Sequence, residues 1–188
     1  MSVSPARRAR LELVAAGARL ARAGLILPGE GNLSVRLPGE ILMTPRGVDK
    51  GMLRPADPVS VPWPGGAVPR EASTEAGLHL EVYRSCPGAG AVVHAHPPAV
   101  QRLAARGRLP RWDLLAEGRD LLGGVGWAGV LPPGSPALAS AVAEALGPVP
   151  AAVLEAHGAV TRGADLGEAL FRMMLLERVA LLTLEVEP

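Results

Sequence analysis

Two histidines separated by a single residue lie at the end of an apolar run in the middle of the chain. Residues 91–93 are small or β-branched, which predicts a buried strand, and Pro97 cannot continue that strand in the middle of a sheet. Side chains two positions apart point to the same face of a strand, whereas they diverge on a helix. His94 and His96 can therefore share one ion. A packed pair of histidines without a ligand is the alternative.

A third histidine follows a second apolar run. Residues 151–155 are predicted as a strand that delivers His157, which Gly158 follows. Three neutral imidazoles with an open position are the ligand set of a catalytic rather than a structural zinc site. A metal held by neutral ligands alone keeps its double charge for an anion. The pattern therefore predicts one zinc ion per chain, bound by His94, His96 and His157.

Composition narrows the class of protein. With 188 residues, of which 48% are hydrophobic, we expect one compact domain over residues 1–188. The formal net charge is +1, without a basic run or an aromatic stripe, so a nucleic-acid partner is not expected. The single cysteine, Cys86, allows no intrachain disulfide, and no apolar run suits a membrane helix or a signal peptide. We therefore expect a soluble cytoplasmic protein without a membrane partner.

Capping residues and the spacing of apolar positions predict the secondary structure. The predicted helices are residues 5–27, a helix capped by Ser73 or Thr74, residues 98–106, residues 136–146 and the segment that follows Asp165. The predicted strands are one that follows the glycine turn within residues 29–37, residues 41–43, residues 59–63, one that begins at residue 91 and carries His94 and His96, and residues 151–155. Residues 124–129 match the pattern G-x-G-x-x-G, but the prolines that follow cannot open the helix that a nucleotide site requires.

Polar residues collect where these elements begin. Gly31 and Asn32 belong to a glycine turn whose backbone N–H groups can bind an anion, although a plain tight turn explains the pattern equally well. Glu75 falls in the first turn of a predicted helix, where the helix dipole alone favours a carboxylate. His79 lies four residues later on the same face, and it either orients Glu75 or simply packs.

Five motifs in a fixed order resemble the class II aldolase and adducin family. They are Gly31-Asn32-Leu33-Ser34, Thr44-Pro45-Arg46-Gly47, Ser73-Thr74-Glu75, His94-Ala95-His96-Pro97 and His157-Gly158. Each motif is weak alone, but the ordered set with all three histidines is highly specific. Within the family, the chain is most similar to the aldolases of L-fuculose 1-phosphate.

The resemblance implies a fold, an assembly and a set of roles. The fold is a three-layer α/β/α sandwich with a central, mostly antiparallel sheet, and the assembly is a homotetramer with active sites at subunit interfaces. The resemblance implies that the three histidines bind zinc and that Glu75 transfers a proton. The implied phosphate cradle is Gly31, Asn32, Gly47, Ser73 and Thr74. Arg46 stands where the closest members usually carry a small hydroxyl residue, and we predict that it reaches the phosphate rather than solvent.

The implied activity is the reversible cleavage of a ketose 1-phosphate to dihydroxyacetone phosphate and an aldehyde such as lactaldehyde. The family's tyrosine that protonates the aldehyde oxygen has no counterpart, because the only tyrosine, Tyr83, falls on the packing face of a helix. Three alternatives remain. They are a zinc-dependent pentulose-5-phosphate 4-epimerase that would use Asp120, a methylthioribulose-1-phosphate dehydratase, and a non-catalytic adducin-like scaffold.

Overall fold

A seven-stranded sheet runs through residues 4–187, the part of the chain that the computed structural model describes. The strands are β1 (Asn32–Leu37), β2 (Glu40–Met43), β3 (Val59–Pro62), β4 (Ala91–Ala95), β5 (Gly126–Ala128), β6 (Ala151–Leu154) and β7 (Gly158–Gly163). Their order is β3-β2-β1-β4-β7-β6-β5, and only β5 and β6 pair in parallel. The sheet is therefore mostly antiparallel, with β4 at its centre.

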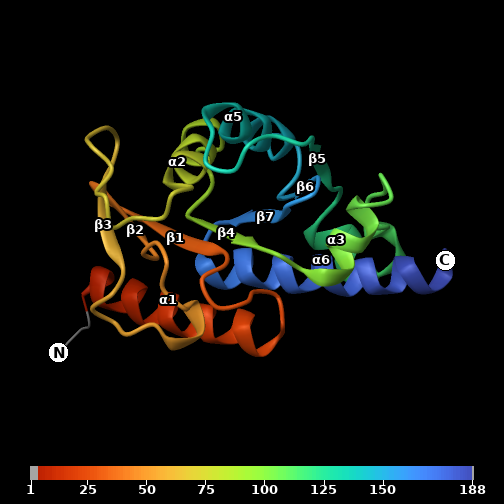
Figure 1. Cartoon of the computed structure of the whole chain (residues 1–188), viewed down its shortest axis with the longest axis horizontal. Helices are drawn as coiled ribbons and strands as arrows, with labels where there is room; N and C mark the ends of the chain where they lie inside the picture. The colour runs from red at the N-terminus through yellow and green to blue at the C-terminus, as the bar shows by residue number, and fades with distance from the viewer. Residues whose placement is uncertain (1–3, 188) are drawn as a thin grey trace.

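Helices cover both faces of the sheet (Figure 1). They are α1 (Pro5–Arg22), α2 (Ala76–Ser85), α3 (Pro98–Ala104), α4 (Ala116–Leu121), α5 (Pro136–Ala145) and α6 (Leu166–Val186), with short 3-10 turns η1 (Lys50–Met52) and η2 (Trp112–Leu114). One face packs against α2 and α5, and the other packs against α1, α3 and α6. This arrangement confirms the predicted three-layer α/β/α fold.

The alternation of strand side chains supplies two separate hydrophobic cores. In β4, Val92 packs on the side of α2 and α5, whereas Val93 packs on the side of α1 and α6. All of β4 is buried, as expected for a central strand with a continuous apolar run. His94 points to the same side as Val92, so the first metal-site candidate is built into the face that α2 covers.

Several predicted boundaries were wrong by a few residues. Helix α1 ends at Arg22 rather than near Leu27, because Gly24 adopts a φ of +70° and turns the chain out of the helix. Helix α2 begins at Ala76, which leaves Glu75 as its N-cap residue rather than a residue of its first turn. Helix α3 ends at Ala104 instead of residue 106. No helix among residues 4–187 is long and apolar enough to span a membrane.

Strand β7 was not predicted. It begins and ends with glycine and contains a threonine and an arginine, so its sequence resembles a loop. The strand forms because it lies between β4 and β6 and pairs antiparallel with both. His157 consequently lies in the tight turn between β6 and β7, and not at the end of a single terminating strand.

Candidate metal centre

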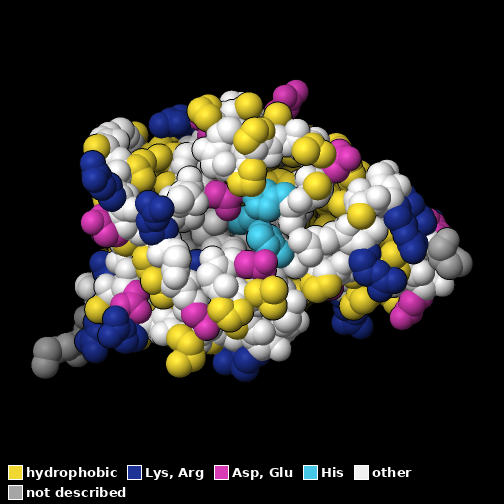
Figure 2. All heavy atoms as spheres, in the orientation of Figure 1, with side chains coloured by type: hydrophobic (Ala, Val, Ile, Leu, Met, Phe, Trp, Pro, Cys, Tyr) yellow, Lys and Arg dark blue, Asp and Glu magenta, His cyan; other side chains and the backbone are white. Residues whose placement is uncertain are grey.

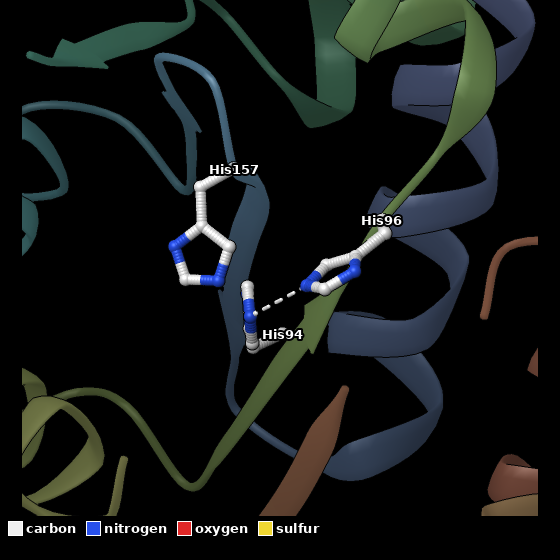
Figure 3. A group of neighbouring side chains, drawn as sticks. All are labelled: His94, His96 and His157. Carbon is white, nitrogen blue, oxygen red and sulfur yellow. Dashed lines mark hydrogen bonds between the residues drawn. The ribbon is translucent and has the colours of Figure 1, made fainter. Parts of the chain in front are cut away.

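Strand β4 and the β6–β7 turn bring three histidines together. His94 is opposite Val160 in the β4–β7 ladder, His96 follows the end of β4, and His157 precedes β7. One nitrogen from each ring lies within 4.8 Å of the others. Figure 3 shows the three rings facing a common point. The predicted ligand set is therefore assembled from segments that are distant in the sequence.

Hydrogen bonds on the outer side of two rings decide which nitrogen faces this point. His94 Nδ1 is 3.0 Å from the carbonyl oxygen of Ala159, and His96 Nδ1 is 3.2 Å from a carboxylate oxygen of Glu30. Both partners can only accept, so both Nδ1 atoms carry a proton. The two Nε2 atoms then face each other at 3.3 Å, the contact drawn as a dashed line in Figure 3.

This separation suits a tetrahedral metal ion. Zinc–nitrogen bonds of about 2.0–2.1 Å place two ligand nitrogens about 3.3 Å apart. Burial lowers the pKa of His96 and brings the pKa of His157 to about 4, so both rings stay neutral and can offer lone pairs. A single proton on one Nε2 would form a hydrogen bond with only one neighbouring ring, whereas a divalent ion could accept a lone pair from all three rings. The residues present therefore fit a metal.

Glu75 lies directly beside the three rings. Its Oε2 atom is 3.2 Å from His94 Nε2 and its Oε1 atom is 3.7 Å from His157 Nε2. Burial alone would raise the pKa of Glu75. When no metal is bound, a second proton on His94, carried by Nε2, would hold that pKa well below its usual range through a hydrogen bond and its charge, and the hydrogen bond from Asn32 acts in the same direction. Oε1 of Glu75 and Nδ1 of His157 are buried without a hydrogen-bond partner among residues 4–187. An ionised carboxylate with one free oxygen suits proton transfer.

A buried chain of hydrogen bonds holds the other oxygen of Glu75. Asn32 donates its Nδ2 proton to Glu75 Oε2 at 2.9 Å, which leaves the Asn32 carbonyl to accept from His79 Nε2. His79 Nδ1 then accepts from the Ser34 hydroxyl at 2.7 Å, and Ser34 accepts from Tyr83 at 2.8 Å. Of the two roles considered for His79, the geometry favours orientation of Glu75, exerted through Asn32.

All six residues predicted for the phosphate cradle line one cavity of about 420 Å³. They are Gly31, Asn32, Arg46, Gly47, Ser73 and Thr74. Glu75, His96 and His157 line the same cavity, and Figure 2 shows the histidine side chains at the bottom of a hollow flanked by carboxylates. A larger hollow of about 540 Å³ between α1 and α6 contains no histidine and lies elsewhere. The roles of the six cradle residues in binding phosphate remain a prediction.

Two residues of this site were missed in the sequence. Glu30 contacts His96, and Lys50 lines the cavity with a side chain that is buried. Neither belongs to a local pattern, because both act through contacts with distant segments. Tyr83 is buried against the sheet and Asp120 is exposed on α4, and neither lines the cavity.

A family model and several known proteins match this chain. The model named Class II Aldolase and Adducin N-terminal domain matches residues 11–184. A methylthioribulose-1-phosphate dehydratase of Acidiphilium cryptum is 36% identical over 188 residues, which cover 92% of this chain and 87% of the relative. An L-fuculose phosphate aldolase of Methanocaldococcus jannaschii is 31% identical over 155 residues, which cover 82% of this chain and 83% of the relative.

Solved structures give the same result. The L-fuculose-1-phosphate aldolase of Thermus thermophilus superimposes with a TM-score of 0.88 and 36% identity, covering 95% of this chain and 94% of the other. YgbL of Escherichia coli, described as a putative aldolase, epimerase or decarboxylase, superimposes with a TM-score of 0.87 and 28% identity, covering 98% and 93%. The aldolases and dehydratases among these relatives are lyases. This chain belongs to the class II aldolase and adducin family.

Proposed function

We propose that this protein is a zinc-dependent aldolase that cleaves a ketose 1-phosphate of the L-fuculose 1-phosphate type to dihydroxyacetone phosphate and an aldehyde such as lactaldehyde. One observation carries the proposal. Three imidazoles converge beside an ionised carboxylate, in a cavity lined by two glycine-containing loops and the start of α2. The imidazoles suit an electrophilic metal ion, and the carboxylate suits a proton transfer. The loops and the start of α2 suit an anionic group of the substrate.

The metal would be held by His94, His96 and His157. A divalent ion bound there would supply a Lewis acid that polarises the ketose. The protein's own part is proton transfer and orientation. Oε1 of Glu75 is the free oxygen, so in the cleavage direction it would accept the proton that the ketose hydroxyl loses as the carbon–carbon bond breaks and then pass it to the carbanion carbon, while Asn32 holds Oε2 in place.

The phosphate is assigned to the loops that meet across the cavity. Backbone N–H groups around Gly31 and Gly47 and the hydroxyls of Ser73 and Thr74 offer neutral donors, and Arg46 adds a cation. Thr74 and Arg46 are exposed, so they lie toward the solvent side of this subsite. Binding a remote phosphate here would position the ketose carbons at the metal end.

A methylthioribulose-1-phosphate dehydratase is the second candidate. The relative from Acidiphilium cryptum, named as that enzyme, is 36% identical over 92% of this chain, and no tyrosine lines the cavity to protonate an aldehyde oxygen. A dehydratase removes a proton next to a carbonyl and expels a hydroxyl group as water. It therefore needs the same metal and carboxylate, but it needs no residue that protonates an aldehyde oxygen.

Metal analysis followed by product analysis tests both candidates. We expect about one divalent ion per chain, lost in His94→Ala. The loaded protein is then incubated with L-fuculose 1-phosphate, methylthioribulose 1-phosphate and ribulose 5-phosphate. Lactaldehyde supports the aldolase, loss of water the dehydratase, and xylulose 5-phosphate an epimerase. A protein that binds metal but converts none of the three is not the enzyme proposed.

We further propose a single domain over residues 1–188 that assembles as a cytoplasmic homotetramer with its active sites at the subunit interfaces. This proposal is supported by the family to which the chain belongs. The structure contains one chain, so the support for a subunit interface comes from the family alone. Light scattering of the purified protein measures the mass. A monomer that retains full activity would contradict the interfacial site.

A further inference from the structure

Lys50 is the only lysine in the chain, and its side chain is buried. The residue is 2% exposed and begins the short turn η1. Its Nζ atom donates one hydrogen bond, to the carbonyl oxygen of Gly29 at a rather long 3.3 Å. An ammonium group carries three donors. Most of the hydrogen-bonding capacity of this buried cation is therefore unused by residues 4–187.

No carboxylate among the described residues lies within ion-pair distance of Lys50. The two carboxylates that line the cavity, Glu30 and Glu75, each contact a histidine instead. Burial lowers the pKa of Lys50, and the charge of the neighbouring Asp49 offsets this only in part. Such a group is costly to the folded protein unless an anion binds beside it.

The backbone around Lys50 is held firmly. A Cβ atom at Gly17 of α1 would lie 2.3 Å from the Lys50 carbonyl oxygen, so helix and turn are in direct backbone contact. Asp49 caps η1 by accepting from the Gly51 N–H at 2.8 Å. Lys50 therefore lines the cavity from a fixed backbone, with its ammonium beside Gly29.

We propose that Lys50 is the cationic anchor of the phosphate subsite, and that the phosphate of the substrate supplies its missing counter-charge beside the Gly29–Asn32 loop. This inference rests on the proposed function for the identity of the ligand. Arg46 lines the same cavity but is exposed, so water and salt screen its charge. The buried lysine therefore contributes more to phosphate affinity than the exposed arginine does.

The single lysine allows a direct test on the unaltered protein. Protein labelled with ¹³Cε-lysine gives one lysine side-chain signal, which is followed as inorganic phosphate is added to the metal-loaded protein at constant pH and ionic strength. We expect a saturable shift, absent when chloride replaces phosphate. An unchanged lysine signal at saturating phosphate, as when phosphate binds only at the metal, overturns the proposal.

Two matched variants measure the contribution of each cation. Lys50→Met and Arg46→Met each remove one positive charge and keep an unbranched side chain. Loss of a charge-assisted hydrogen bond should weaken phosphate binding about 10- to 100-fold in Lys50→Met and less than about threefold in Arg46→Met. Lys50→Met should melt no lower than the wild type, because it removes an uncompensated buried charge. A lower melting temperature with unchanged phosphate affinity would mean that Lys50 only braces the Gly29 loop, contrary to the proposal.

These measurements separate the two claims. Phosphate binding is read without turnover, so a protein that shifts its lysine signal but converts no ketose phosphate disproves the proposed function and keeps the anchor. If a ketose phosphate is converted, Lys50→Met should raise KM with a smaller effect on kcat, as expected for a remote binding group. An unchanged KM would rule out the anchor while the enzyme function stands.

Discussion

The two faces of the sheet are packed by different means. On the face toward α1, α3 and α6 the core is apolar. Fully buried Thr161 and Thr183 donate their hydroxyl protons to backbone carbonyls, Thr161 to Ala169 and Thr183 to Val179. On the face toward α2, a line of polar side chains runs through the core from Tyr83 to Glu75.

This difference separates stability from chemistry. The apolar face stabilises the fold by removing apolar surface from water, and this contribution does not depend on the orientation of individual groups. The α2 face holds donors and acceptors in one order, in which each group accepts from the residue before it and donates to the residue after it. Such a chain gives Glu75 one fixed oxygen and one free oxygen, at the cost of leaving buried groups unsatisfied if any member is lost.

Glu75→Gln should produce the largest effect, and only on the polar face. The amide keeps size and polarity but cannot exchange a proton, so kcat should fall about 10² to 10⁴-fold while metal content stays the same. Kinetics and metal analysis of the same preparation check this. Glu71→Gln, a nearby exposed carboxylate, serves as the control and should leave kcat unchanged. An active Glu75→Gln enzyme would assign proton transfer to another group.

Leu176→Ala addresses the apolar face. Leu176 is fully buried in α6, so the truncation should lower the free energy of unfolding by about 2–5 kcal/mol. The metal affinity of the folded protein should not change, since the histidines and Glu75 gather toward the other face. Denaturant melts and metal titration measure the two quantities. A parallel loss of metal affinity would show that the faces are coupled.

His79→Leu should alter the dependence of stability on pH. Burial brings the pKa of His79 to about 3, far below the ordinary value of about 6.5. Below about pH 6 the unfolded chain therefore binds a proton that the folded protein does not bind. The free energy of unfolding then decreases by up to about 1.4 kcal/mol for each pH unit by which the pH is lowered. Metal-free wild type should lose this contribution progressively between about pH 6.5 and pH 3, and the variant should show a shallower slope over that range. Equal slopes would mean that His79 is charged in the folded state.

Arg46→Thr should have the smallest effect. Because the guanidinium is exposed, kcat/KM for the phosphorylated ketose should fall by about threefold or less, mostly through KM. Kinetics at low and high salt test the cause, since a screened charge loses its influence at high ionic strength. Equal kinetics at low salt would give Arg46 a surface role only.

Local patterns predicted much of this molecule. The spacing of His94 and His96 could be interpreted from the geometry of a strand alone. The start of α5 at residue 136 could be predicted from its own residues alone. Both outcomes depend on residues that are adjacent in the sequence. The family resemblance then added the three layers and the mostly antiparallel sheet.

Contacts between distant segments could not be predicted in this way. Strand β7 exists because β4 and β6 pair with it, and nothing in its own composition requires a strand. Glu30 and Lys50 reach the site through the loop before β1 and through η1, and their contacts there are with segments that are distant in the sequence. The tautomers of His94 and His96 likewise depend on partners that only the folded chain supplies.

The central position of β4 has a consequence for folding kinetics. Its neighbours in the sheet, β1 and β7, lie far before and far after it in the chain, so the three histidines meet only when long loops have closed. We expect the site to be completed after the folding transition state. A bound metal would therefore slow unfolding and leave the folding rate unchanged, making chelation a means of shortening the lifetime of the native protein without hindering its formation.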